Sequence, residues 1–242
     1  MKYLIINGSP RKKNTWVVVK QVKTNLEGDF EEIQLAKEKI PLCNGCHKCV
    51  IEGKEKCPHF DKVNPIIEKL HDADGQIITS PVYAMNVTGL LKNLFDHTAY
   101  LYHRPEFFTK KALVIVTTAG AGHKKVAKYM DETLRHWGMN KVYQLKFACG
   151  GKDSLDTKAI DKVSKQFKND VESNKLHSPK FMDIIFYQVW RAMAVSEQPM
   201  ETDSKFWHET GLVDHDFAPE VKLGLIKKAF AKLMFRIMKM VM

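Results

Sequence analysis

Four of the five cysteines of this 242-residue chain lie within 15 residues, at Cys43, Cys46, Cys49 and Cys57. The first three are spaced by two residues each, so their thiols can converge on one side of a tight turn, where Gly45 permits the required backbone. Without a secretory signal, such clustering indicates a metal or redox role and not a disulfide framework. Zinc ligands usually come as two separated pairs, so three close cysteines and a distant fourth favour a [4Fe–4S] cluster over structural zinc. Zinc, a disulfide and free thiols remain as alternatives.

A second group of polar residues, Gly8 to Thr15, follows an apolar run and precedes a helical pattern. The hydroxyls of Ser9 and Thr15, the amide of Asn14 and the free backbone N–H groups at a helix start suit a bound phosphate dianion. Arg11 adds a side chain for a charge-assisted contact. The segment is neither a GxxxxGK[ST] loop nor a GxGxxG turn, which disfavours nucleoside triphosphates and dinucleotide pyrophosphates. Its plainer interpretation is a Gly-Ser-Pro turn followed by an ordinary helix cap.

The hydrophobic pattern alternates five times between short apolar runs and helical spacings before residue 175. The expected strands are residues 2–7, 30–35, 75–80, 112–117 and 142–148. The expected helices are residues 14–26, 61–71, 87–101, 123–137 and 154–171. Apolar strands separated by helices predict an α/β fold, a doubly wound five-stranded parallel sheet covered on both faces. Ligands of such sheets bind outside the carboxyl ends of the strands, which makes the expected site the loops 8–15, 81–89 and 118–122.

The pattern changes near residue 176, which predicts a domain over residues 1–175 and a C-terminal helical extension over residues 176–242. The expected elements of the extension are a helix, a link and a last helix, over residues 181–195, 199–211 and 219–242. The last helix has an apolar face opposite a basic one. The basic face carries Lys228, Lys232, Arg236 and Lys239, and the apolar face carries Leu223, Ile226, Phe230, Leu233, Met234, Ile237 and Val241. We expect the apolar face to be covered by the preceding helix or by a second copy of the chain. An anionic membrane surface is the less favoured partner.

Two motifs stand at the expected loops: Ile6-Asn7-Gly8-Ser9-Pro10-Arg11 with Asn14-Thr15, and Ser80-Pro81-Val82-Tyr83 with the helix Gly89 to Asp96. In this order they resemble the flavodoxin-like NAD(P)H-dependent FMN reductases, over residues 1 to about 150. The cysteine spacing resembles the iron–sulfur flavoprotein branch of that group. His97 departs from the family pattern, which usually has arginine at this position.

The resemblance implies a flavodoxin-like sheet that binds FMN. It implies that the phosphate is held by Ser9, Arg11, Asn14 and Thr15. It implies that the isoalloxazine edge is followed by Pro81, Val82, Tyr83, Ala84 and Met85, and that the site is closed by Thr118, Ala119 and Gly120. A [4Fe–4S] cluster on the four cysteines would lie next to the flavin and exchange electrons with it.

The activity implied by the resemblance is that of an NAD(P)H-dependent FMN oxidoreductase. Electrons would pass from NAD(P)H or a reduced carrier to a small-molecule or protein acceptor. Flavin chemistry needs no acid–base triad, and the sequence has no HExxH or GxSxG motif and no carboxylate dyad. Two other functions remain open, a non-enzymatic electron carrier like flavodoxin and a cysteine-based redox sensor. The net charge of +10 counts against the carrier, because flavodoxins are typically acidic.

The charge is spread along the chain and forms no basic cluster interleaved with aromatic residues, so nucleic acid is not an expected partner. The longest strongly apolar stretch, Phe181 to Val195, has 15 residues and contains Asp183 and Arg191, whereas a spanning helix needs roughly 20. The first residues lead straight into a glycine turn, so we expect a core strand there and not a signal peptide. We therefore expect a cytoplasmic protein, and the resemblance implies a homo-oligomer such as a dimer.

Overall fold

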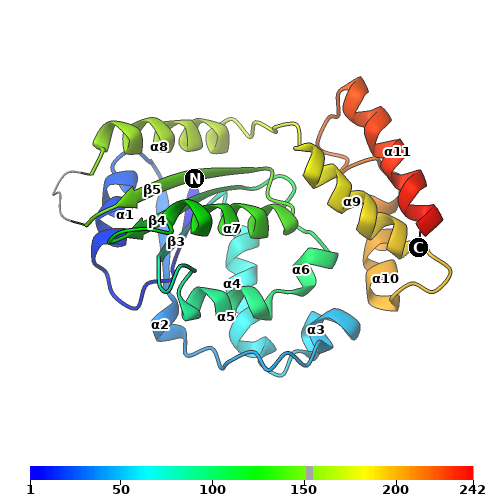
Figure 1. Ribbon diagram of the computed structural model, residues 1–242, viewed down its shortest axis with the longest axis horizontal. Coiled ribbons are helices and arrows are strands. Elements are labelled where there is room, and N and C mark those ends of the chain that lie inside the picture. Colours follow the sequence, from blue (N-terminus) through cyan, green and yellow to red (C-terminus); the bar gives the residue numbers. More distant parts are fainter. Residues whose placement is uncertain (151–154, 242) are drawn as a thin grey trace.

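The computed structural model describes residues 1–150 and 155–241. Its centre is a five-stranded sheet in the order β2-β1-β3-β4-β5, in which every neighbouring pair is parallel (Figure 1). The strands are β1 Lys2–Asn7, β2 Asp29–Gln34, β3 Gly75–Pro81, β4 Lys111–Thr118 and β5 Lys141–Ala148. This is the strand order of flavodoxin-like doubly wound sheets, so the predicted fold class is confirmed.

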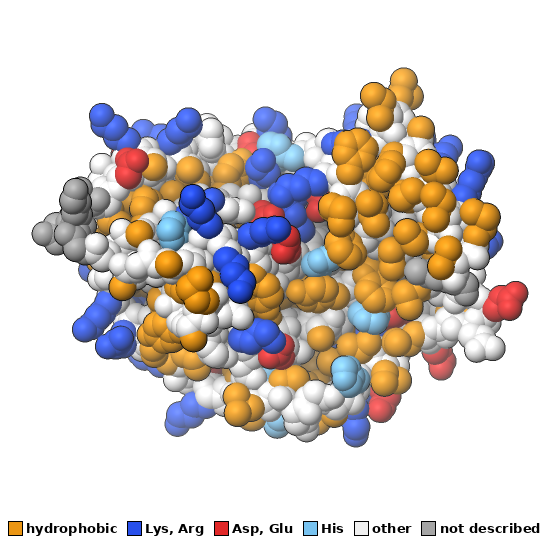
Figure 2. Space-filling view, in the orientation of Figure 1, with side chains coloured by type: hydrophobic (Ala, Val, Ile, Leu, Met, Phe, Trp, Pro, Cys, Tyr) orange, Lys and Arg blue, Asp and Glu red, His pale blue; other side chains and the backbone are white. Residues whose placement is uncertain are grey.

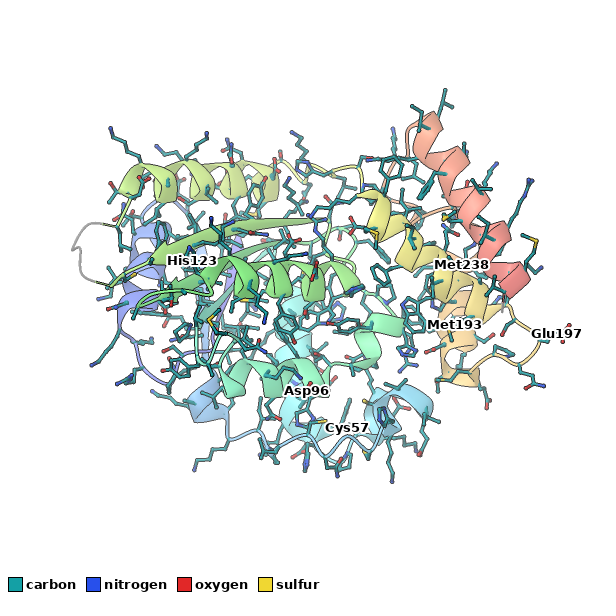
Figure 3. All side chains as sticks on the ribbon, in the orientation of Figure 1. Cys57, Asp96, His123, Met193, Glu197 and Met238 are labelled. Atoms are coloured by element: carbon teal, nitrogen blue, oxygen red, sulfur yellow. The ribbon has the colours of Figure 1, made fainter. Side chains whose placement is uncertain are left out.

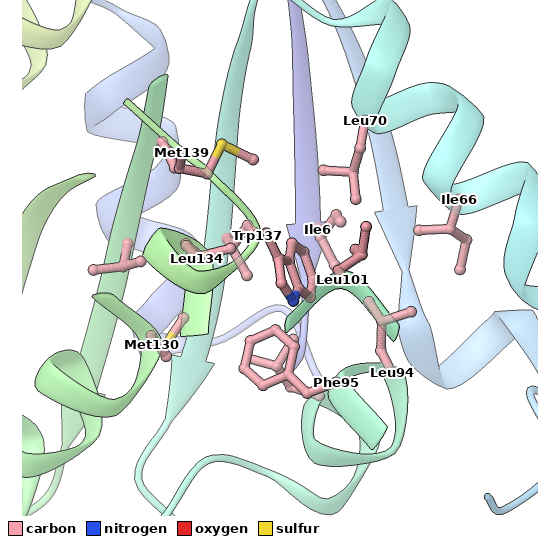
Figure 4. Packing of buried hydrophobic residues seen from close by; sticks show 14 of the residues in the cluster. Ile6, Ile66, Leu70, Leu94, Phe95, Leu101, Met130, Leu134, Trp137 and Met139 are labelled. Carbon is pink, nitrogen blue, oxygen red and sulfur yellow. The ribbon is translucent and has the colours of Figure 1, made fainter. Parts of the chain in front are cut away.

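Helices cover both faces of the sheet, as strands that are apolar on both sides require. One face is covered by α1 (Asn14–Lys23) and α8 (Thr157–Glu172). The other face is covered by α4 (Phe60–Asp72), α5 (Gly89–His97) and α7 (His123–His136). Figure 4 shows this second core, where the buried Trp137 ring meets Phe95 edge-on with the ring centroids 5.5 Å apart.

Short helical segments lie in the connections: α2 Leu35–Glu38, α3 Lys48–Ile51, the 3-10 turn η1 Lys54–Lys56 and α6 Tyr100–His103. The helix expected over 87–101 is therefore two helices, α5 and α6. The break falls at Thr98, whose hydroxyl donates to the carbonyl oxygens of Leu94 (3.0 Å) and Phe95 (3.1 Å). Such bonds compete with the helical backbone ladder and favour a bend.

After α8 the chain forms α9 (Phe181–Ala194), α10 (Glu201–Glu209), η2 (Leu212–Asp214) and α11 (Leu225–Val241). The link expected over 199–211 is wrong, because most of it is α10. Gly211, at a φ of 69°, follows the end of this helix. One face of α10 is buried through Trp207, which lies in a third hydrophobic core. Ser154 and Met242, the outer ends of two expected helices, lie outside the described residues.

The last helix packs on α9, as expected, but the packed face is rotated from the expected one: Leu223, Phe230 and Met234 of the expected face are half-buried, and the rest of the contact comes from other residues. The buried residue of α11 is Ala231, and the guanidinium of Arg191 in α9 lies 4.1 Å from the centre of the Phe235 ring. Ile226 and Leu233, which were expected to be covered, are 79% and 53% exposed. Large apolar residues occur on both sides of α11, so the pattern alone could not select the packed side. Within residues 1–150 and 155–241, no helix has the length and apolarity needed to cross a bilayer.

Candidate active site

The first loop leaves β1 at Asn7, whose side chain organises the turn. Its oxygen accepts the Ser9 N–H (2.9 Å) and the Thr79 hydroxyl (3.2 Å), and its amide donates to Gln34 Oε1 (2.8 Å). Gln34 in turn donates to the Ser9 carbonyl. The nearly buried Ser9 hydroxyl accepts the Arg11 N–H at 3.3 Å, and among the described residues it donates to no protein group. Its proton is therefore available to a ligand.

The helix α1 begins directly after this loop, at Asn14, and no side chain caps it. The first backbone N–H groups of an uncapped helix are unsatisfied and form the positive end of its dipole. Arg11 and Asn14 are exposed beside them. The described residues thus present a hydroxyl, backbone donors and a cation at one point, which fits the phosphate group expected there.

Hydrogen bonds join the three loops, which follow β1, β3 and β4. The hydroxyls of Thr15 and Thr117 are 2.6 Å apart, which connects the start of α1 to β4. The Val82 N–H donates to the Thr117 carbonyl at 2.8 Å, which connects the second loop to β4. Thr88, the N-cap of α5, donates its hydroxyl to the Gly8 carbonyl at 2.7 Å. Nothing in the sequence marks Thr88 or Thr117 for this role, because only the strand order brings them to the loops.

The second loop is a tight turn between Tyr83 and Asn86, whose backbone groups exchange two hydrogen bonds of 2.9 Å. Its central residues, Ala84 and Met85, have φ angles of 47° and 63°, a left-handed conformation that is unfavourable for residues other than glycine. Because the N–H groups of Val82 and Tyr83 are bonded within the protein, the backbone donors left for a ligand along this edge are those of Ala84 and Met85. Strained backbone of this kind is typical of ligand sites.

The third loop lies against the second. The Thr118 hydroxyl donates to the Ala121 carbonyl (2.8 Å) and accepts the Gly120 N–H (3.2 Å). Gly122 has a φ of 91°, and a Cβ atom there would lie 3.0 Å from Val82 Cγ1 and 3.1 Å from Met85 Sδ. The positive φ favours glycine here, and a Cβ would also press on these two side chains.

At the start of α7, His123 follows the third loop (Figure 3). Its Nδ1 atom is buried and has no hydrogen-bond partner within the described part of the chain. A buried polar atom without a partner is unfavourable, and a bound group would relieve it. The sequence gives no signal for His123, because no nucleophile or acid stands at a recognisable spacing from it.

The cysteine segment, residues 40–57, runs beneath α5 (Figure 1). At one end the Cys43 N–H donates to Asn93 Oδ1 at 2.9 Å. At the other end Cys57 Sγ lies 3.7 Å from Nδ1 of the buried His97, whose Nε2 donates to the Pro41 carbonyl at 2.8 Å. A carbonyl can only accept, so Nε2 carries a proton, and in the tautomer protonated only there Nδ1 accepts a hydrogen bond from the Cys57 thiol. The histidine that departs from the family pattern therefore joins the two ends of the segment.

The middle of the segment is held by Arg104 and by the C-terminal extension. The Arg104 guanidinium donates to the carbonyl oxygens of Cys49 and Val50 and pairs with Asp203 of α10. The hydroxyl of Thr202, next to it, also donates to the Val50 carbonyl, at 3.0 Å. The extension thus contacts the cysteine segment directly, which the sequence did not indicate.

The four expected ligands are neighbours, but their side chains do not enclose a metal. Burial raises the pKa of Cys49, and the nearby thiols of Cys57, Cys43 and Cys46 raise it further, so all three lie close enough to act on Cys49 electrostatically. Among the described residues, no group of three or more His, Cys, Asp or Glu side chains is arranged to hold a metal ion. The segment lies along α5, where Cys43 is hydrogen-bonded to Asn93 and Cys57 lies beside His97.

The sheet order and the uncapped helix beside it define a doubly wound protein of the nucleotide-binding class. Within that class the chain belongs to the NADPH-dependent FMN reductase family, whose model matches residues 1–153. It is an NAD(P)H-dependent FMN oxidoreductase.

Named relatives agree with this assignment. The chain is 29% identical to an iron–sulfur flavoprotein of Archaeoglobus fulgidus over 222 residues, which cover 88% of this chain and 100% of that protein. It is 32% identical to an NADPH azoreductase of Bacillus sp. (strain OY1-2), over 50% of this chain and 61% of that one. The crystal structure of Smu.1420 from Streptococcus mutans has the same fold, with a TM-score of 0.53 and 17% identity over 70% of this chain and 100% of that one.

Proposed function

We propose that FMN binds across the three loops, with its phosphate on Ser9, Arg11, Asn14 and Thr15. The observation that carries this proposal is the uncapped start of α1 beside the free Ser9 hydroxyl, at the carboxyl ends of the strands. Pro81 to Met85 would follow the ring edge, where Ala84 and Met85 offer backbone N–H groups to its carbonyl and nitrogen atoms. Thr118, Ala119 and Gly120 would close the site.

When bound, FMN accepts a hydride or single electrons and passes them on. The protein's own contribution is to orient the ring and to place hydrogen-bond donors along one edge of it, which sets how readily electrons enter. NAD(P)H is the donor of the family, and we propose a small molecule as the acceptor. The azoreductase relative supports a small-molecule acceptor. A protein acceptor would instead require complementary charge around the loops.

The test compares FMN with riboflavin, which has the same ring without the phosphate. The native chain is expected to bind FMN far more tightly than riboflavin. Ser9→Ala should lower the affinity for FMN by about 10- to 100-fold, because it removes one hydrogen bond to a charged group. Riboflavin affinity should change little. Ser173→Ala, which removes an exposed hydroxyl at the end of α8, is the control. Equal losses of affinity for both flavins would show that the phosphate does not contact Ser9.

Anaerobic oxidation of NADPH and NADH by the FMN-loaded protein tests the donor. Turnover with an added azo compound or quinone would support a small-molecule acceptor. Reduction only by a reduced protein carrier, with no pyridine nucleotide oxidised, would favour the electron-carrier alternative.

We also propose that Cys43, Cys46, Cys49 and Cys57 ligate one [4Fe–4S] cluster. Their spacing, their electrostatic proximity and the name of the archaeal relative support this assignment. The side chains would have to turn inward on loading, so no electron-transfer step is assigned to the cluster. After anaerobic reconstitution, Cys46→Ser should lower bound iron and sulfide, whereas Cys149→Ser, the fifth cysteine, should not. One zinc ion per chain and no sulfide would identify a zinc site instead.

We propose a division of the chain into residues 1–175 and 176–242. The third core supports it, because apart from Phe108 its buried members all belong to the C-terminal part, from Ile184 to Ala231. The contacts of α10 with the cysteine segment would then make the extension a support for that segment.

A further inference from the structure

The helix α11 exposes an apolar stripe that nothing in the described chain covers. Ile226, Leu233 and Met240 are 79%, 53% and 78% exposed, and their spacing of seven residues places them on one side of the helix. The stripe continues onto the start of α9, where Phe181 meets Phe230 of α11 with the ring centroids 5.0 Å apart. Figure 2 shows hydrophobic side chains gathered over these two helices. A continuous exposed patch of this kind marks an interaction surface.

A basic stripe runs beside the apolar one. It consists of exposed residues at steps of four, four and three: Lys228, Lys232, Arg236 and Lys239. The ion pairs between described residues include none of these four side chains. The opposite side of α11 packs on α9 through Ala231 and Phe235, so both stripes face outward. The exposed half of the helix is therefore amphipathic.

We infer that the α9–α11 face binds the surface of an anionic lipid bilayer, with α11 lying in the plane of the interface. Apolar side chains would enter the boundary between head groups and acyl chains while the basic stripe meets the lipid phosphates. A second copy of the chain fits less well. An antiparallel two-fold interface through the apolar stripe would bring the same unpaired cations of both copies to one side of the interface.

The flavin loops remain accessible in this orientation. The carboxyl ends of the strands lie at one end of the molecule and α11 at the other (Figure 1). Binding through α11 would thus hold the enzyme at a membrane with its proposed flavin site open to water. The inference does not depend on the flavin assignment, because it uses none of the loop residues.

The test is co-sedimentation of the full chain with vesicles of phosphatidylglycerol and phosphatidylcholine, against phosphatidylcholine alone. Binding is expected only to the anionic vesicles. It should weaken when salt is raised from about 0.1 M to about 1 M, which shortens the Debye length from ~10 Å to ~3 Å. Lys232→Gln with Arg236→Gln should lower the partition coefficient about 25-fold, since each basic residue at such a surface contributes a factor of about five.

The matched control is Lys158→Gln with Lys162→Gln, an exposed pair with the same spacing on α8, which should bind as the native chain does. Far-UV circular dichroism and flavin content confirm that each variant is folded. Equal binding to both vesicle types, or none to either, would overturn the inference. So would a dimer in lipid-free sedimentation that Leu233→Glu dissociates, because the apolar stripe would then contact a second copy.

Discussion

The hydroxyl pair of Thr15 and Thr117 joins the start of α1 to the end of β4. Both residues are buried, so Thr15→Val leaves the Thr117 hydroxyl without this partner while keeping the shape of the side chain. We expect a loss of about 1–3 kcal/mol in the free energy of unfolding of the apoprotein, measured in urea. The double variant with Thr117→Val should lose less than the sum of the two single changes. Additive losses would mean that the two hydroxyls act separately.

His136 makes a second prediction at the scale of single residues. Its ring stacks on Tyr102 and meets Phe186 edge-on, with centroid distances of 4.7 and 4.1 Å. Burial lowers the pKa of His136, and the nearby Asp183 and Glu132 only partly oppose this. As the pH falls below about 6.5, the unfolded chain binds a proton here before the folded one does, so stability decreases.

His136→Phe replaces the titrating imidazole with an aromatic ring that cannot bind a proton. The variant's Tm should fall less than that of the native protein between pH 7 and pH 5. His208, which is exposed, provides the control as His208→Phe. Parallel Tm curves for His136→Phe and the native protein would show that His136 does not contribute to acid sensitivity.

Among the secondary-structure elements, α10 is expected to contribute most to the stability of the cysteine segment, through the ion pair that Asp203 makes with Arg104. The side chains of Arg104 and Asp203 are 7% and 4% exposed, and Asp203 also contacts Nδ1 of His103 at 2.8 Å. Asp203→Asn leaves the arginine charge buried without a counter-charge, which costs about 3–5 kcal/mol. Urea unfolding should show this loss, and limited proteolysis should cut the cysteine segment faster. Glu201→Gln, an exposed acid in the same helix, should change stability by less than about 0.5 kcal/mol.

The third loop allows a comparison of two glycines. Gly122 needs a positive φ and touches Met85, whereas a Cβ at Gly120 would meet nothing within 4 Å. Gly122→Ala should therefore lower the stability of the apoprotein by about 1–2 kcal/mol, and Gly120→Ala should leave it nearly unchanged. Thermal unfolding of the two variants measures the difference. Equal effects would mean that the loop adapts to a methyl group at either place.

The sequence predicted the strands well because β1, β3 and β4 contain short apolar runs, while β2 and β5 at the sheet edges alternate between apolar and polar residues. The strand expected over 75–80 is Gly75–Pro81 in the structure, and the loops that follow the strands lie together as expected. The contacts inside the site could not be predicted in the same way. The bond from Gln34 to Ser9 and that from Thr15 to Thr117 join residues far apart in the sequence, and they exist only because of the strand order.

The cysteine segment shows the same limit. Its spacing was visible, but its supports are side chains from three later parts of the chain, Asn93, Arg104 and Asp203. The helix α10 was missed because Pro199 and Gly211, which lie just outside its two ends, were interpreted as a link.

For the molecule as a whole, the two parts of the C-terminal extension are expected to differ in importance. Removing residues 225–242 takes away a helix whose packing is confined largely to α9, so flavin binding should survive and vesicle binding should be lost. Removing residues 176–242 also takes away Asp203 and the cover of Phe108. That shorter chain should unfold or aggregate at moderate temperature, as size-exclusion chromatography would show. A stable, monomeric 1–175 fragment would mean that the extension supports nothing in the first domain.

The bond between Arg104 and Asp203 also sets an order of events during synthesis. The two residues are 99 positions apart, so at about 5–20 residues per second the ribosome needs roughly 5–20 s to supply the carboxylate after the arginine. The first four strands can already pair in that interval, since all of them precede residue 119. The thiols at 43–57 meanwhile lack the α10 contacts and are open to the surrounding solution. Any group that these thiols acquire can therefore reach them before the last third of the chain is made.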